Sequence, residues 1–291
     1  NKFKLSIKNK DNYLIPQILI ERELRNYCKN LKQVSINFCT EIVEITEKNN
    51  YYKMKVKKKE NITSIINTQK SLIFACDGPN SFIRKKLNIR FIGKSYNEWI
   101  VVDYHNEKID FNANFEWNIT NKPFMYVSLL KNHFRIEFHS SYLKNNFQEL
   151  DNDYYKLLRK FLPENIYNII KSLKPDRFSK YIMHNRFAET FQKKNLYLVG
   201  DSAHVIIPFL GKGITEGFND VKYIENNLFN LEKYTKIRKN SLKMLFYKSL
   251  ILNNIIHMCH NKNKFFIKTY EFILYLLPKF IIDKFLKFIQ S

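Results

Sequence analysis

Glycine is scarce in this sequence: the 291 residues contain six, and none precedes Gly78. This absence excludes a glycine-rich phosphate-binding loop from the first 77 residues. Glycine is required where a backbone takes a positive φ or must approach a ligand closely. Four of the six, Gly200, Gly211, Gly213 and Gly217, fall within eighteen residues, so this segment is the first candidate for a functional site.

Paired cysteines, long apolar runs and a secretion signal are also absent. The four cysteines form no C-x-x-C pair, which excludes common zinc modules and a disulfide scaffold and favours a reducing compartment. No run of about 18 uncharged apolar residues could cross a bilayer, and Asn1–Lys4 lacks the apolar stretch of a signal peptide. We expect a cytoplasmic protein without a metal site, because His257, Cys259 and His260 on one helix cannot converge on one ion.

Acidic residues are few relative to basic ones, since 49 Lys and Arg against 27 Asp and Glu give a net charge of +22. Such a field attracts nucleic acid, anionic lipid or anionic small molecules. The lysines are spread along the whole chain beside abundant Asn, Ile and Tyr, a usage typical of an AT-rich genome. We therefore expect no nucleic-acid partner. Hydrophobic residues at 45% permit a sizeable core, which excludes a disordered chain.

Hydrophobic periodicity predicts a mixture of helices and strands. Two segments, Leu72–Cys76 and Leu196–Val199, are apolar throughout, as expected of strands that are covered on both faces. The predicted helices are 16–31, 151–173 and most of the chain from 213 onward. The predicted strands are 34–38, 41–46, 51–56, 62–66, 71–75, 99–104, 124–130, 133–138 and 195–200.

The strand that ends at Val199 leads into a polar turn with an acidic residue, Gly200-Asp201, and Gly211 and Gly213 then open a helix. This order places a carboxylate beside a helix start that carries no side chain. Free N–H groups and the helix dipole at such a start stabilise a negative charge. By itself the pattern also fits a plain strand, turn and helix.

The other apolar strand ends in the same way, in Asp77-Gly78, and Ser81 and a helix containing Arg84 follow. Together the two segments resemble the paired signatures of single-component, FAD-dependent aromatic monooxygenases, the para-hydroxybenzoate hydroxylase-like group. The first segment resembles the DG motif of that family, and the second, with Pro208, resembles its GD motif. The likeness covers residues 14 to 240.

The resemblance implies an α/β fold in which a Rossmann-like FAD-binding domain carries an inserted antiparallel β-sheet substrate domain and a helical C-terminus. The opening strand, G-x-G-x-x-G turn and helix of that family have no counterpart before Gly78, so the FAD-binding domain is N-terminally incomplete. A missing N-terminal segment supplied separately is one way to complete it. The implied domains are 1–92 (partial FAD-binding, DG motif), 93–183 (substrate), 184–232 (FAD-binding, GD motif) and 233–291 (C-terminal helical region).

The resemblance also implies the cofactors, FAD with NADH or NADPH as reductant, and the residues around them. The cofactor-binding residues it implies are Gln17, Asp77, Gly78, Arg84, Gly200, Asp201, Pro208, Gly211, Lys212, Gly213 and Ile214. The hairpin from 124 to 138 resembles the substrate-covering sheet of the phenol and hydroxyphenylpropionate hydroxylases, and the implied substrate pocket contains Tyr126, Phe134, Ile136 and Phe209.

The implied activity is hydroxylation of an aromatic or conjugated small molecule through a flavin hydroperoxide in a water-poor pocket. No side chain is expected to act as a nucleophile. Two alternatives remain open: a truncated, non-catalytic remnant of the fold that acts as a binding protein, and a related flavin-dependent reductase or halogenase. The halogenase lacks support because Trp99 and Trp117 are the only tryptophans and form no W-x-W-x-I-P stretch.

The C-terminal segment 265–289 interleaves aromatic and aliphatic residues with lysines. This basic amphipathic pattern fits either packing against the FAD-binding domain or peripheral association with an anionic membrane surface.

Overall fold

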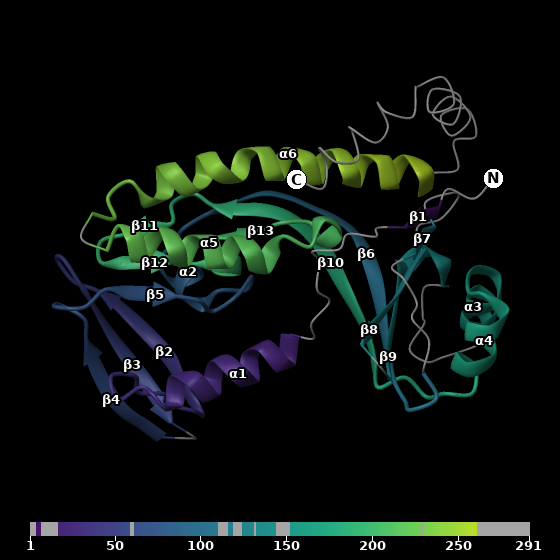
Figure 1. Cartoon of the computed structure of the whole chain (residues 1–291). Coiled ribbons are helices and arrows are strands. Elements are labelled where there is room, and N and C mark those ends of the chain that lie inside the picture. Colours follow the sequence, from purple (N-terminus) through teal and green to yellow (C-terminus); the bar gives the residue numbers. More distant parts are fainter. Residues whose placement is uncertain are drawn as a thin grey trace. The chain divides into compact units, whose positions relative to one another are not determined.

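The computed structural model describes residues 4–6, 17–58, 61–109, 116–118, 124–130, 132–143, 152–228 and 230–260. The chain forms two compact units, each built from separate chain segments (Figure 1). Unit 1 comprises 1–31, 96–183 and 254–285, and unit 2 comprises 32–95, 184–253 and 286–291. Two long strands, β6 (Phe91–His105) and β10 (Arg177–Ala188), have residues in both units.

Unit 1 contains an antiparallel sheet in the order β1-β7-β8-β9-β6-β10. The predicted hairpin is present as β8 and β9, which pair with Tyr126 opposite Ile136. The remaining elements of this unit are helical, and α1 buries none of its residues. Besides β6 and β10, the bounds of the strands and α-helices in this unit are β1 Lys4–Ser6, α1 Gln17–Lys29, β7 Glu116–Asn118, β8 Phe124–Leu130, β9 His133–His139, α3 Asn152–Phe161 and α4 Glu164–Ile170.

One face of this sheet forms the core of unit 1 together with α3 and α4. Successive side chains of a strand point to opposite faces, and the residues that β6, β8 and β9 contribute to this core are all even-numbered. Tyr104 on β6 and Tyr154 on α3 join their hydroxyls at 2.7 Å inside it. The main members of the core are Ile100, Val102, Tyr104, Phe124, Tyr126, Phe134, Ile136, Phe138, Tyr154, Leu157, Leu158, Ile166 and Ile170.

Unit 2 contains two small sheets. In one, β5 and β12 run parallel and β11 pairs with β12 from the other side; in the other, β2, β3 and β4 form an antiparallel meander. Short 3-10 turns and helices follow the parallel strands. The bounds are β2 Thr40–Glu47, β3 Tyr52–Lys58, β4 Asn61–Asn67, β5 Ile73–Ala75, α2 Phe82–Lys86, β11 Gln192–Lys193, β12 Leu196–Leu198, η2 Gly200–Ser202, β13 His204–Val205, η3 Pro208–Leu210, α5 Gly213–Asn226 and α6 Tyr234–His260.

Most predicted elements are confirmed, and three expectations are wrong. Residues 34–38 form no strand, and the predicted helix over 151–173 is divided at Pro163 into α3 and α4. The strand β12 is buried throughout as expected, whereas in β5 the Phe74 side chain is exposed, so β5 is not covered on both faces. The predicted amphipathic segment 265–289 lies outside the described residues.

The described helices include none that is long and apolar enough to cross a bilayer. The longest of them, α6, carries lysines along its length.

Gly93 is the glycine that the packing requires most strictly. Its φ is +133°, and a Cβ placed on it would lie 2.1 Å from the carbonyl oxygen of Asn185 on β10. That oxygen and the Cα of Arg186, at 2.8 Å from the same Cβ, both belong to the backbone, so neither can move aside cheaply.

We therefore expect Gly93→Ala to lower the free energy of unfolding by at least about 2 kcal/mol, since strain and steric overlap both act against the native strand. Urea unfolding followed by circular dichroism measures this. Gly213→Ala is the matched control, because a Cβ there meets nothing within 4 Å and its φ is not positive; equal losses in the two variants would contradict the steric argument.

Candidate functional site

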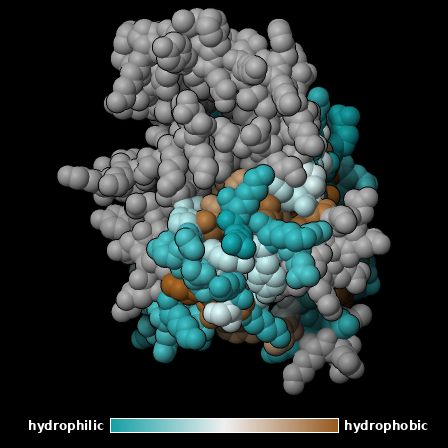
Figure 2. All heavy atoms as spheres, turned by 90° about the vertical axis from the view of Figure 1, so that its right-hand side faces the viewer, coloured by the Kyte–Doolittle hydropathy of each residue, from teal (hydrophilic) through white to brown (hydrophobic). Residues whose placement is uncertain are grey.

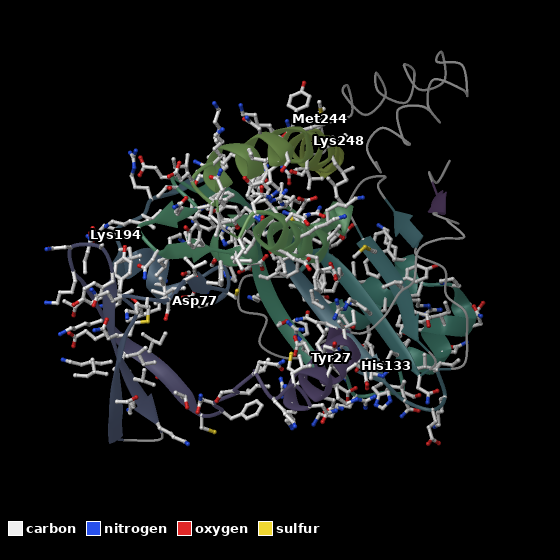
Figure 3. The ribbon with its side chains drawn as sticks, turned by 60° about the vertical axis from the view of Figure 1, so that its left-hand side comes forward. Tyr27, Asp77, His133, Lys194, Met244 and Lys248 are labelled. Atoms are coloured by element: carbon white, nitrogen blue, oxygen red, sulfur yellow. The ribbon has the colours of Figure 1, made fainter. Side chains whose placement is uncertain are left out.

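The predicted site residues on the two acidic turns come together at one edge of the parallel sheet in unit 2. β5 and β12 pair in register from Ile73 opposite Leu196 to Ala75 opposite Leu198. Since carboxyl ends of parallel strands meet at one edge, the turns with Asp77 and Asp201 leave the sheet side by side. Figure 3 shows Asp77 at this end and Lys194, which precedes β12, at the other.

The first turn is held by its own side chains and by a buried arginine. The Asp77 carboxylate accepts a hydrogen bond from the N–H of Ile83 at 3.0 Å, and the Ser81 hydroxyl caps α2 by accepting one from the N–H of Arg84 at 2.9 Å. Gly78, with φ +77°, supplies the left-handed residue between them.

Arg84 joins the two turns. It is 3% exposed, and its guanidinium donates to the carbonyl of Ser202 at 2.8 Å and to that of Pro79 at 2.7 Å. It also lies 3.7 Å from the centre of the Phe91 ring. Burial lowers its pKa, and the charge of Asp77 opposes that effect. In this structure Arg84 therefore organises the turns.

The second turn exposes its acidic side chain. Gly200, at φ +61°, starts η2, and its Cα lies in van der Waals contact distance of a Cβ built on Gly217 of α5, at 3.7 Å. Partial desolvation raises the pKa of the neighbouring Asp201 carboxyl, and the charge of His204 opposes the rise. No described residue hydrogen-bonds to that carboxylate, so it is open to a ligand.

The start of α5 is bare. Lys212 occupies the N-cap position without a side-chain hydrogen bond, so it caps none of the first N–H groups of the helix. Gly211 has φ +63°, which explains a glycine there. Gly213 has neither a positive φ nor a neighbour within 4 Å of a built Cβ, so nothing among the described residues explains its lack of a side chain.

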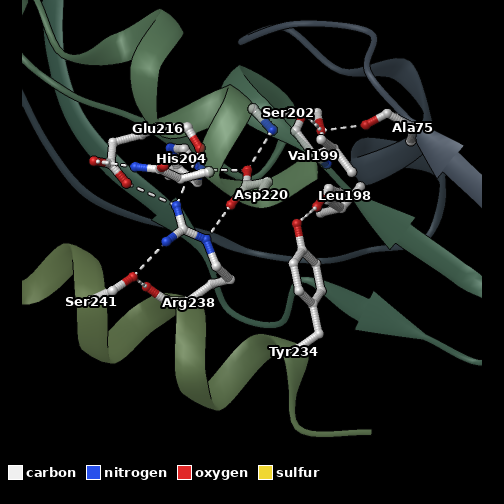
Figure 4. A network of polar contacts seen from close by, with 12 residues as sticks. Ala75, Leu198, Val199, Ser202, His204, Glu216, Asp220, Tyr234, Arg238 and Ser241 are labelled. Carbon is white, nitrogen blue, oxygen red and sulfur yellow. Dashed lines mark hydrogen bonds and ion pairs between the residues drawn. The ribbon is translucent and has the colours of Figure 1, made fainter. Parts of the chain in front are cut away.

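A buried polar network lies behind this start (Figure 4). The Asp220 carboxylate accepts from the N–H of Gly200 at 2.8 Å, lies 2.7 Å from His204 Nε2 and accepts from Arg238 Nε at 2.6 Å. Arg238 also donates to the Glu216 carboxylate at 2.8 Å. Burial opposes the charge of Arg238, but these hydrogen bonds raise its pKa.

Part of this network was foreseeable from the sequence. The hydrogen bond of His204 beside the turn agrees with the structural role that its position after Gly200-Asp201 suggests. The sequence pattern did not indicate that Asp220 and Arg238 are buried, because hydrophobic periodicity assigns buried positions to apolar residues. On α5 the apolar residues Ile214, Phe218 and Val221 are each about half exposed, at 52%, 52% and 51%, while Asp220 is fully buried.

The other predicted site residues lie in unit 1 or outside the described side chains. Gln17 is exposed on α1 and donates to Glu21 Oε1 at 2.6 Å. Tyr126, Phe134 and Ile136 are buried in the core against α3 and α4. The side chain of Phe209 is not among the described ones. Gln17, Tyr126, Phe134 and Ile136 belong to unit 1 and the two turns to unit 2, and the roles of all five residues stay predictions.

The opposite face of the unit 1 sheet carries a polar cluster. Arg135 on β9 donates to both oxygens of Asp103 on β6, at 2.6 and 3.1 Å. Glu137, two residues along β9, accepts from the hydroxyl of Tyr181 on β10 at 3.1 Å. Burial raises the pKa of Glu137, and the charge of Arg135 opposes the rise.

A polar hollow in unit 1 lies away from these residues, beside α3 and α4, and is bordered by Arg159, Glu164 and Lys171 among others. The coloured atoms of the face shown in Figure 2 are mainly hydrophilic, with small separate hydrophobic areas. Within the described ranges no three His, Cys, Asp or Glu side chains are grouped so that they could hold a metal ion.

The sequence matches known proteins over most of its length. A family model described as "FAD binding domain" matches residues 2–235. A 3-(3-hydroxy-phenyl)propionate/3-hydroxycinnamic acid hydroxylase of Escherichia coli O8 is 29% identical over 188 residues, which cover 63% of this chain and 32% of the relative. The protein of the same name from Klebsiella pneumoniae subsp. pneumoniae is 32% identical over 155 residues, covering 51% and 26%. The chain spans a third or less of these relatives.

Solved structures confirm the predicted fold. The p-nitrophenol 4-monooxygenase PnpA from Pseudomonas putida DLL-E4 has a TM-score of 0.69 at 17% identity and covers 95% of this chain and 73% of its own. The flavin-dependent monooxygenase PieE, solved in complex with FAD and substrate, has a TM-score of 0.67 at 13% identity and covers 84% and 45%. Likeness at these identities shows an FAD-binding α/β fold.

Replacement of Arg84 by lysine is expected to destabilise unit 2. A lysine cannot donate to the carbonyls of Pro79 and Ser202 in the same fork geometry, so at least one buried acceptor loses its charged donor. We expect Arg84→Lys to cost about 1.5–3 kcal/mol of unfolding free energy. The control Arg90→Lys alters an exposed ion pair with Glu189 and should cost no more than about 1 kcal/mol. Chemical unfolding measures both, and similar losses would refute the bridging role.

The pH dependence of unit 1 is expected to reflect Glu137. Because its pKa is raised in the folded protein, the stability associated with its protonated form is present at acidic pH and is lost as pH rises from the ordinary glutamate range through the raised pKa. Glu137→Gln should remove this loss, while the exposed Glu98→Gln should retain it. Urea unfolding can be followed by the fluorescence of Trp99, which is buried in unit 1; identical pH profiles for both variants would count against the assignment.

Proposed function

Because the chain belongs to the FAD binding domain family, we propose that it forms the flavin- and substrate-domain portion of an FAD-dependent monooxygenase. The proposed reaction is hydroxylation of an aromatic or similarly conjugated small molecule. The names of its relatives, hydroxylases of phenylpropionate and cinnamic acid derivatives, support this class of substrate. We place the enzyme in the cytoplasm, where NADH or NADPH is available as reductant.

Gly213 is the observation that carries this proposal. Gly213 has no positive φ, a Cβ built on it meets none of the described residues within 4 Å, and a glycine in a helix costs conformational entropy. Its absent side chain makes sense if a ligand lies against the start of α5. The donors present suit FAD: the open Asp201 carboxylate can accept hydrogen bonds from ribityl hydroxyls, and the uncapped N–H groups of α5 can stabilise negative charge on the ring.

The chain itself binds, orients and shields. FAD, when bound, takes electrons from NADH or NADPH and activates oxygen for transfer to the substrate. Arg84 holds the two turns in a fixed relation, so that Asp77 and Asp201 remain at one edge of the sheet. Asp220 fixes the backbone of Gly200 and with it the position of Asp201. We retain Gln17, Tyr126, Phe134, Ile136 and Phe209 as proposed contacts of cofactor and substrate.

A separately supplied N-terminal segment is part of the proposal. β5 pairs with β12 alone among the described strands, and Leu72, just before β5, and Phe74, on β5, are 43% and 39% exposed. Parallel strands are normally covered on both faces. A further strand, glycine-rich turn and helix would cover these residues and supply the missing phosphate-binding backbone.

FAD titration tests the proposal. The chain, alone or co-expressed with the segment encoded immediately upstream, should bind FAD and become yellow. Gly213→Leu should weaken the affinity at least about tenfold because the new side chain occupies the ligand space. The same change at the exposed Lys222 of α5, Lys222→Leu, should leave the affinity unaltered.

Thermal unfolding of the variants shows whether a lost affinity reflects lost folding. Unaltered unfolding of Gly213→Leu with weakened flavin binding supports the site. Failure of both preparations to take up FAD would instead favour a non-catalytic binding protein with this fold.

A further inference from the structure

The acidic residues of α5 are distributed in an unusual way. Glu216 lies in the first turn of the helix, near the end where the helix dipole is positive, and Asp220 lies one turn later, near the middle of the helix. A carboxylate in a first turn normally stabilises its own helix by neutralising that positive end. In α5 it would therefore compete with any anionic group that binds at the bare start beside Gly213.

Both carboxylates accept hydrogen bonds from the guanidinium of Arg238 on α6. Arg238 donates to Glu216 Oε2 at 2.8 Å and to Asp220 Oδ1 at 2.6 Å, and the side chains of Arg238, Asp220 and Glu216 are 6%, 0% and 15% exposed (Figure 4). The same guanidinium bonds to the Glu216 carbonyl at 3.2 Å and to the Ser241 hydroxyl at 2.6 Å. All its nitrogens are thus held within this network.

The outward side of α5 contains no acid near its start. Ile214, Thr215 and Phe218 are exposed, and Lys212 precedes the helix. The helix therefore buries Asp220 and most of Glu216 and leaves Ile214, Phe218 and Val221 about half exposed. Farther along, it buries Ile224 and exposes Lys222 and Glu225. Folding of a soluble helix does not require burial of Asp220 and Glu216, since apolar residues normally form the buried stripe. It does keep negative charge off the surface on which a ligand would lie.

The charge balance shows what Arg238 contributes. Taken by themselves, Asp220, Glu216 and Arg238 carry one formal net negative charge, and without Arg238 they would carry two. In a partly buried environment, the charge of Glu216 interacts with the helix start, because only a few residues separate the two. The arginine is the cation that limits their effect there.

We infer that Arg238 is a positioning residue of the proposed cofactor site. Its positive charge binds the carboxylates of Glu216 and Asp220 and offsets their negative charge, and so keeps the start of α5 positive for an anionic ligand group. The use of this device rests on the proposed function, but its electrostatics can be measured without flavin. Arg238 itself does not reach the ligand; it acts through the two carboxylates and, by way of Asp220, through the backbone of Gly200.

The test uses an introduced thiol as a probe of the local potential. Ile214→Cys places the thiol at an exposed position in the first turn of α5, and Leu228→Cys, just beyond the end of α5, is the distant control. The alkylation rate by iodoacetamide at each position, followed by mass spectrometry at low salt and neutral pH, reports the thiolate fraction.

Removing the negative partner and removing the positive partner of the Glu216–Arg238 ion pair should change the alkylation rate in opposite directions. In the Ile214→Cys chain, Glu216→Gln should raise the alkylation rate about threefold and Arg238→Gln should lower it about threefold. Arg238→Lys should restore the parent rate, and the Leu228→Cys control should respond to none of them. If the ion pair merely supports the fold, both Gln variants should lose stability and neither should show a raised alkylation rate.

Equal or same-direction changes in the two Gln variants would overturn the inference. If Arg238→Gln does not fold, Glu216→Gln decides: a raised rate supports the inference and an unaltered rate overturns it. Neither readout depends on FAD, so a chain that passes this test and still binds no flavin refutes the proposed function alone.

Discussion

The pairing of two three-residue strands, β5 and β12, is the constraint on which the site depends. Because these strands run parallel and in register, the turns that follow them must leave the same edge of the sheet. The hydroxyl of Ser202 lies 2.6 Å from the carbonyl of Ala75, and Arg84 bridges the same turns from the other side. Segments more than a hundred residues apart in sequence thereby act as one surface.

Glycines and arginines contribute to that surface in different ways. Gly200 and Gly211 allow left-handed turns, and the contact of Gly200 with Gly217 lets η2 lie close to α5. Arg84 and Arg238 then supply buried cations that satisfy carbonyl and carboxylate oxygens. A site of this kind is assembled largely from backbone groups and buried charges, with Asp77 and Asp201 at the ends of its two strands.

The sequence predicted the parts of the fold that depend on local pattern. The two acidic turns, the hairpin of β8 and β9 and the bare start of α5 were all expected and are present. Strand alternation separates the two faces of the hairpin, but it does not tell which one α3 and α4 cover. Tyr126, Phe134 and Ile136 lie in the core with these helices, and their role in a substrate pocket stays a prediction. The buried charges could not be predicted, since their partners come from distant elements.

The exposure of apolar residues on α5, beside the buried Asp220, has a consequence for the evolution of this chain. Purifying selection for folding alone would conserve the inward Asp220 and Ile224 and would let the outward Phe218 and Val221 drift to polar residues, because those side chains contribute little buried area within the described structure. Apolar side chains that persist at those outward positions in related chains would therefore record selection by something that binds there. At these two outward positions of α5, the usual link between hydrophobicity and structural constraint is reversed.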